Sequence, residues 1–184
     1  YEETVSAAKR FIEFHPNDKD VPYAYYLVGL SYYDQVLAIG RDQELAKEAL
    51  KVFALIADEY PQSEYAANSQ IRFNFLRDHL ASKEMEVGRY YLKRSHYVPA
   101  INRFRGVIEE FSTTSQVPEA LHRLVEAYLS LGFTDEAQTA GAILGHNYKS
   151  TDWYDRTYQL LISKGLKPKA SGNSWLSKIY RQVI

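Results

Sequence analysis

The stretch from Val87 to Ser112, VGRYYLKRSHYVPAINRFRGVIEEFS, carries the pattern that decides the fold. In its first half, Val87 and Gly88 precede Tyr91. A large residue, a small residue and a ring at this spacing let a second helix approach closely while the ring fills the gap. The second half places small and apolar residues on one helical stripe, namely Ala100, Phe104 and Val107. The stretch therefore predicts two amphipathic helices that pack against each other.

The same pattern recurs on both sides of this stretch. Further copies of the second helix are Tyr1–Pro16, Ala49–Pro61 and Thr134–Lys149. Further copies of the first-helix signature are Val28-Gly29 with Tyr32 and Leu124-Val125 with Tyr128. This residue pattern resembles the tetratricopeptide repeat, a helix pair with a period of about 34 residues. We therefore expect an all-α solenoid, a superhelix of antiparallel helix pairs.

The spacing of glycine and proline predicts one unusually long helix. Neither residue occurs from Gln62 to Val87. We expect a single long middle helix over residues 64–94, or two helices that meet with a slight kink near Ser82. Between the helices of the first complete repeat, the insertion Gln35–Glu44 contains Gly40 and predicts a surface loop.

The two ends of the chain differ in character. We expect the repeat array to cover residues 1–163 and to start at the second helix of a repeat, which predicts a fragment that lacks upstream residues. Residues 164–184 hold five bases and no acid. They predict a mobile basic tail that carries a short apolar turn around Trp175.

Composition and charge exclude several classes of protein. The 184 residues include no cysteine, which excludes disulfides, thiolate metal sites and cysteine nucleophiles. No apolar run approaches the roughly 18 residues of a membrane-spanning helix. Acids outnumber bases by twelve to six in residues 1–64, and bases outnumber acids by sixteen to eleven in residues 65–184. A general nucleic-acid binder would be basic throughout, so we expect no nucleic-acid partner.

No catalytic or metal-ligating pattern stands out. The five histidines lack the spacing of a metal site, and the sequence contains no nucleophile elbow, phosphate-binding loop or dinucleotide motif. The acid pairs Asp58-Glu59 and Glu109-Glu110 are adjacent, and adjacent residues of a helix do not face each other. We expect a binding protein rather than an enzyme, with no cofactor and no metal.

The order of the repeats and their residue sequences resemble those of the BamD family of outer-membrane β-barrel assembly lipoproteins. The segments that carry this resemblance are Lys9–Pro16, Tyr23–Leu30, Arg72–Ala81, Tyr90–Arg94 and Ala100–Phe104. The resemblance implies a scaffold on the periplasmic face of the Gram-negative outer membrane that holds BamA through its fifth POTRA domain. It also implies contacts with other lipoproteins of the complex and with unfolded outer-membrane proteins. The family's lipid anchor sits on an N-terminal cysteine that this sequence does not contain.

A basic face is the first candidate binding site. Residues 87–108 contain no acid, and their bases are Arg89, Lys93, Arg94, Arg103 and Arg105. The functional interpretation is a docking face for an acidic partner domain, and the alternative is a solvated helix face. The resemblance implies that Asn102 and Arg103 match the position of the family arginine that contacts BamA.

A row of tyrosines is the second candidate site. Tyr23, Tyr26 and Tyr33 lie on one helical face together with Leu30. In the repeat family this face lines the concave groove, where the rings could stack on an extended peptide. The alternative is that these rings pack on upstream helices.

Other adaptors built from the same repeat remain an alternative, such as a pilus-assembly or cell-division lipoprotein or a cochaperone. A cochaperone would need a carboxylate clamp of Lys, Asn and Arg in one groove. The residues expected to face the groove in the clearest repeat are Met85, Arg89, Leu92 and Lys93. They include no Asn, which argues against such a clamp.

Overall fold

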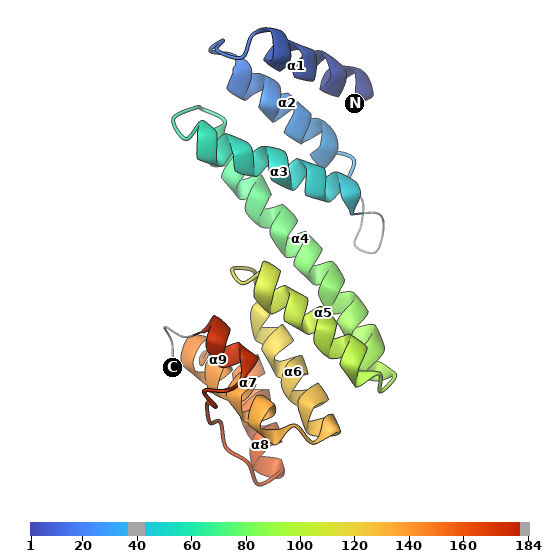
Figure 1. The fold of residues 1–184 in the computed structure, drawn as a ribbon, viewed down its shortest axis with the longest axis vertical. Helices are drawn as coiled ribbons and strands as arrows, with labels where there is room; N and C mark the ends of the chain where they lie inside the picture. The colour runs from blue at the N-terminus through green and yellow to red at the C-terminus, as the bar shows by residue number, and fades with distance from the viewer. Residues whose placement is uncertain (37–42, 181–184) are drawn as a thin grey trace. The chain divides into compact units, whose positions relative to one another are not determined.

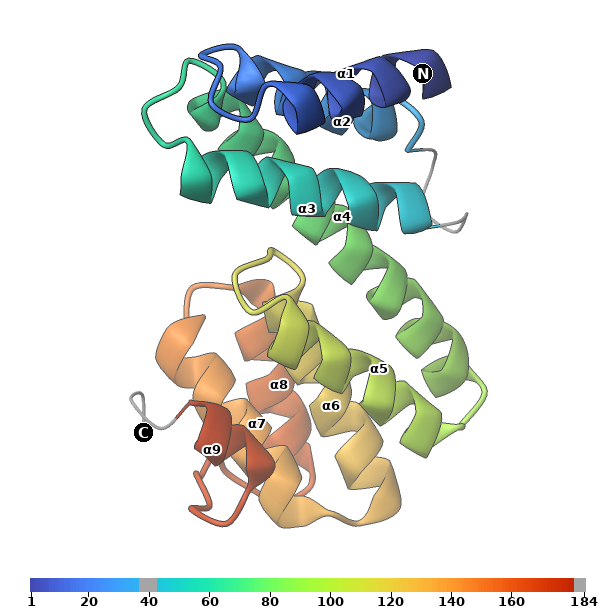
Figure 2. The same cartoon turned by 45° about the horizontal axis from the view of Figure 1, so that its top comes forward.

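The structure, a computed structural model, describes residues 1–36 and 43–180. Its helices are α1 (Glu2–Phe14), α2 (Val21–Tyr33), α3 (Glu44–Glu59), α4 (Ala66–Lys93), α5 (Tyr97–Glu110), α6 (Val117–Leu131), α7 (Thr134–Asn147), α8 (Asp152–Ser163) and α9 (Trp175–Ile179) (Figures 1 and 2). No strand occurs in these two ranges, so the all-α prediction is confirmed. Most of the expected loop at Gln35–Glu44, and the last four residues of the tail, lie outside the described residues.

The helices pair as expected for the tetratricopeptide repeat. Consecutive helices pack on one another, α1 on α2 and α2 on α3, then α5 on α6 and α6 on α7. Helix α8 packs against both α6 and α7. The predicted repeat solenoid is therefore confirmed as the fold class.

The long middle helix is also confirmed. Helix α4 runs from Ala66 to Lys93 and comprises 28 residues (Figure 1). It is a single helix in the structure, without the second helix that a break near Ser82 would have produced. Within α4, no proline removes a backbone donor, and no glycine precedes Gly88. This absence explains why the helix continues.

Close contacts group the chain into two compact units, Tyr1–Leu80 and Ala81–Ile184. In the first unit, Phe53 of α3 is fully buried against Gly29 of α2. In the second unit, Phe104 of α5 is fully buried against Gly88 of α4. In both units two helices thus approach closely at a glycine, as the sequence pattern predicted. The ring that the glycine meets is a phenylalanine of the next helix and not the tyrosine three residues after it.

The C-terminal segment contains the short apolar turn that the sequence predicts around Trp175. Its apolar turn forms α9, which packs on α7, and Leu176 is fully buried there. The Trp175 indole N–H donates a 2.7 Å hydrogen bond to the Tyr128 hydroxyl. The predicted apolar turn around Trp175 thus packs on the repeats through a few apolar side chains, although the segment that carries it is basic.

Candidate protein-binding surfaces

The residues of the predicted basic face do not form one surface. Asn102 and Arg103 line a pocket of about 400 Å³ together with Glu84, Tyr91, Pro99, Gly106 and Glu110. We call it the Arg103 pocket. It lies between α4 and α5, within the unit Ala81–Ile184.

Arg103 is held in this pocket by an acid from the neighbouring helix. One of its terminal nitrogens lies 3.1 Å from Oε2 of Glu84, and 46% of the Arg103 side chain is exposed. Half-exposed ion pairs contribute only about 0–1 kcal/mol to stability. The pair therefore orients the guanidinium without removing it from solvent.

Arg89 and Lys93 line a different pocket, of about 450 Å³, in the same unit. Its other lining residues are Leu92, Tyr97, Arg123, Glu126 and Ser130. We call it the α4–α6 pocket. Three of the four residues expected to face a groove do line it, but Met85 is fully buried in the core, so that prediction is wrong for Met85.

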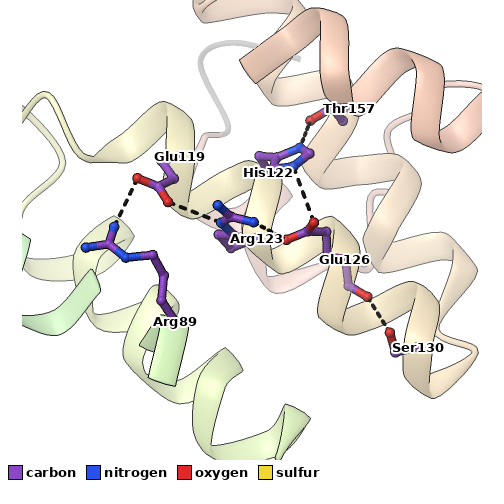
Figure 3. Close-up of polar contacts among 7 residues, drawn as sticks. All are labelled: Arg89, Glu119, His122, Arg123, Glu126, Ser130 and Thr157. Carbon is purple, nitrogen blue, oxygen red and sulfur yellow. Dashed lines mark hydrogen bonds and ion pairs between the residues drawn. The ribbon is translucent and has the colours of Figure 1, made fainter. Parts of the chain in front are cut away.

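A network of ion pairs and hydrogen bonds runs along one side of the α4–α6 pocket (Figure 3). The Glu119 carboxylate lies 3.1 Å from Arg89 and, through its other oxygen, 3.1 Å from Arg123. Arg123 also lies 2.9 Å from Glu126. Each acid is shared, so the two arginines are held at defined positions.

Two side chains anchor this network to α8. Nδ1 of the buried His122 lies 2.8 Å from the Thr157 hydroxyl, and its Nε2 lies 3.6 Å from Glu126. Burial raises the pKa of Glu126, but hydrogen bonds from His122 and Arg123 and the charge of Arg123 outweigh it, so the net shift is downward. Glu126 therefore stays ionised at pH values below the usual pKa range of a glutamate.

The other two bases of the predicted face contact rings of this chain. The Arg105 guanidinium lies 4.7 Å from the ring centre of Trp175, and its Nε lies 2.7 Å from Glu109. The Arg94 guanidinium lies 3.8 Å from the ring centre of Tyr90. Neither base lines the Arg103 pocket or the α4–α6 pocket.

Sequence reasoning missed the acids that accompany these bases. The window 87–108 contains no acid, yet Glu84 and Glu119 approach it from outside. Glu84 lies one helical turn before Gly88, which is a signal that a wider window would have included. The pairing of Arg89 with Glu119 depends on how two helices pack, so no local pattern indicates it.

The tyrosine row lies in the unit Tyr1–Leu80 and faces residues that follow it in the chain. Tyr23 and Tyr26 lie 5.4 Å and 5.0 Å, centre to centre, from the ring of Tyr65. Tyr33 lies 5.8 Å from the ring of Phe75 on α4. The structure brings the three predicted tyrosines together along one aromatic surface.

Arg72 of α4 lies among these rings. Its guanidinium is 5.6 Å from the ring centres of both Tyr26 and Tyr33. Tyr23 and Phe75 stay 46% and 53% exposed. Sequence reasoning missed Arg72 and Phe75 as members of this surface, although their spacing of three residues places them on one helical face.

The described residues give no sign of a metal site or a membrane span. No three or more His, Asp or Glu side chains in ranges 1–36 and 43–180 converge on a point where a metal ion could bind. Within the same ranges, every helix is too short or too polar to cross a bilayer.

Comparison with known proteins gives one consistent result. Residues 1–143 match the family model YfiO, described as an outer membrane lipoprotein. A protein of Caulobacter vibrioides named outer membrane protein assembly factor BamD is 42% identical over 168 residues, which cover 91% of this chain and 55% of that protein. Proteins with the same name from Rickettsia prowazekii and Neisseria meningitidis are 42% and 31% identical and cover 88% and 86% of this chain. The chain spans between about half and two thirds of the length of these relatives.

Proposed function

Since this chain belongs to the BamD family of outer membrane protein assembly factors, we propose that it is a scaffold subunit of the complex that assembles β-barrel proteins in that membrane. In this role it binds the periplasmic POTRA region of BamA and helps to recruit or insert outer-membrane proteins. The full-length protein sits on the periplasmic face, held by a lipid anchor, together with other lipoproteins of the complex. The relatives are named assembly factors, which supports a binding role rather than catalysis.

The observation that carries the proposal is the Arg103 pocket. This pocket has a volume of about 400 Å³ and presents the half-exposed Arg103 guanidinium beside the Asn102 amide. It lies on the helix pair whose sequence decides the fold. A guanidinium can bind a carboxylate through two parallel hydrogen bonds, which gives both strength and orientation. Because Glu84 already orients Arg103, an acidic group of the fifth POTRA domain meets a pre-positioned partner.

The experiment is a titration of this chain against the isolated fifth POTRA domain of BamA from the same organism. We expect Arg103→Glu to weaken binding by about tenfold or more, because it replaces attraction by repulsion at a contact. Glu84→Gln removes the charge that orients Arg103 but keeps the guanidinium, so it should weaken binding less than Arg103→Glu does. Lys149→Glu, an exposed reversal in the same unit outside the pocket, is the matched control and should change little.

Each outcome has a definite meaning when circular dichroism shows equal helicity for all variants. Equal binding by Arg103→Glu and Lys149→Glu would remove Arg103 as the anchor. No binding by the well-folded parent would contradict the POTRA interaction of this chain and favour the alternative, a different adaptor of the same repeat type.

The tyrosine row supports a second part of the proposed role, the capture of extended outer-membrane protein segments. Tyr23, Tyr26 and Tyr33 present ring faces and hydroxyls, and exposed aromatic surface of this kind suits a peptide with alternating side chains. Pull-down of an unfolded outer-membrane protein by the tagged chain tests this part. Tyr23→Ala should reduce capture, whereas Tyr158→Ala, a similarly exposed tyrosine of α8, should not. Equal capture by both variants would exclude the tyrosine row.

A further inference from the structure

The α4–α6 pocket is separate from the Arg103 pocket and has its own chemistry. The last turns of α4 form one wall with Arg89, Leu92 and Lys93, and α6 forms the other wall with Arg123, Glu126 and Ser130. Figure 3 shows Arg89 reaching from α4 toward the row of side chains on α6. The two pockets share no lining residue.

Bases outnumber acids in the lining of this pocket. Three bases line it against one acid, Glu126. Glu119, the acid that joins Arg89 to Arg123, is only 15% exposed, whereas the Arg89 side chain is 41% exposed. Lys93 is exposed at the rim. Glu119 therefore lies behind Arg89. Glu126 is 32% exposed beside the 25% exposed Arg123, so the lining keeps an excess of bases over acids.

The two arginines of the pocket are also held in place before any ligand binds. Arg123 lies 5.4 Å from the ring centre of Trp153, and Arg156 lies 5.1 Å from the same ring. His122 packs against this ring at 5.3 Å between centres. A guanidinium carries five N–H donors, so a paired arginine retains donors for a ligand. Fixing these side chains in advance lowers the ordering cost of binding.

The remaining lining suits a polypeptide. Leu92 supplies partly exposed apolar surface, and the hydroxyls of Tyr97 and Ser130 supply polar groups. Hydrogen bonds to Ser95 and Ser130 lower the pKa of Tyr97, so this phenol lies in a polar setting. Because Glu126 is present among the bases, the pocket fits a few spaced carboxylates better than a continuous phosphate backbone.

From this geometry we propose that the α4–α6 pocket binds an extended acidic segment of a partner protein, with its carboxylates on Lys93 and Arg89. Arg123 and Glu119 position Arg89 and close the back of the site. This binding site is independent of the Arg103 pocket, so one unit of the chain can hold two partners, or two parts of one partner, at the same time.

The test uses the whole chain and a fluorescein-labelled peptide of alternating Glu and Thr, followed by fluorescence anisotropy. A peptide of alternating Gln and Thr is the neutral probe. We expect the acidic peptide to bind, more weakly as salt is added, and the neutral peptide not to bind. Lys93→Glu should weaken binding by about tenfold and Lys93→Gln by less. Lys149→Glu, an exposed reversal in the same unit, is the matched control.

Amide chemical-shift mapping locates the peptide. Shifts confined to residues 89–97 and 119–130 are the expected result, and Arg103→Glu should leave them and the affinity unchanged. Equal binding of the two peptides, equal effects of Lys93→Glu and Lys149→Glu, or shifts centred on residues 99–110 would each overturn the proposal. The POTRA titration depends on Arg103 and this one on Lys93, so either proposal can fail alone.

Discussion

At the scale of single residues, two glycines differ in how closely another helix approaches them. A Cβ placed on Gly88 would come within 2.8 Å of Cδ1 and 2.9 Å of Cζ of the Phe104 ring. Phe104 is fully buried and has no room to retreat. On α5, by contrast, a Cβ placed on Gly106 meets nothing within 4 Å. The same substitution at these two sites should therefore have opposite effects.

We predict that Gly88→Ala lowers the free energy of unfolding by about 1–3 kcal/mol, because the extra methyl group overpacks a filled core. Gly106→Ala should raise it by up to about 1 kcal/mol, because alanine has the better helix propensity and restricts the unfolded chain. Urea denaturation followed by circular dichroism measures both. Equal effects of the two changes would show that Phe104 does not restrict Gly88.

A second residue-scale prediction concerns Glu126. Hydrogen bonds and charge from His122 and Arg123 lower its pKa against the effect of burial. A carboxyl with a lowered folded-state pKa adds stability that is present above its unfolded pKa and is lost as pH falls toward the folded value. We expect the urea concentration at the denaturation midpoint to decrease as the pH is lowered from about 5 to about 3. The decrease should be smaller in Glu126→Gln. The control is Glu86→Gln, on the exposed side of α4, which should keep the parent's dependence on pH.

At the scale of elements, α9 shows how a short segment docks on the repeats. Leu176 is fully buried, and the Ser174 hydroxyl caps α9 by accepting a hydrogen bond from the Leu176 N–H. The Ser174 hydroxyl also donates to the Glu136 carboxylate of α7, and the Thr139 hydroxyl accepts from the Ser171 N–H at 3.0 Å. The segment before α9 is thus tied to α7 by polar contacts, and α9 itself by apolar ones.

We predict that Leu176→Ala lowers the free energy of unfolding of this unit by about 2–5 kcal/mol, because it leaves a cavity in the core. Ile179→Ala, a change of similar size at an exposed position of the same helix, should have a small effect. Limited proteolysis after Lys164 or Lys169 provides a second measurement, since an undocked α9 exposes this segment. Similar results for the two variants would contradict the docking of α9.

At the scale of the whole molecule, the two compact units predict separate unfolding events. The stability of a repeat protein depends on contacts between neighbouring repeats. A substitution that weakens one repeat therefore destabilises mainly the repeats that contact it. Gly29 meets Phe53 in the unit Tyr1–Leu80 as Gly88 meets Phe104 in the other unit. Each glycine therefore offers a way to weaken one unit at a time.

We predict that Gly29→Ala lowers hydrogen-exchange protection in α1, α2 and α3 and leaves α6, α7 and α8 unchanged. Gly88→Ala should give the reverse pattern. Native-state hydrogen exchange read by mass spectrometry on proteolytic fragments distinguishes the units. Uniform loss of protection in either variant would indicate that the chain unfolds as one cooperative unit.

The candidate sites were predictable only in part. Asn102 and Arg103 could be chosen from the sequence through a family resemblance, and the tyrosine row from its helical spacing. The division of the basic face into two pockets could not. A helix of about 3.6 residues per turn points neighbouring bases in different directions, and which of them meet an acid depends on the partner helix.

The sequence by itself determined the all-α class, the helix pairing and the long middle helix. These follow from local patterns with a fixed period, in which a glycine and a ring recur at the spacing that two packed helices require. Only the tertiary structure decided that Arg103 meets Glu84, that Arg89 meets Glu119 and that Trp175 reaches Tyr128. These partners lie 19, 30 and 47 residues apart in the chain. Contacts over such separations depend on how whole helices pack, which no local pattern records.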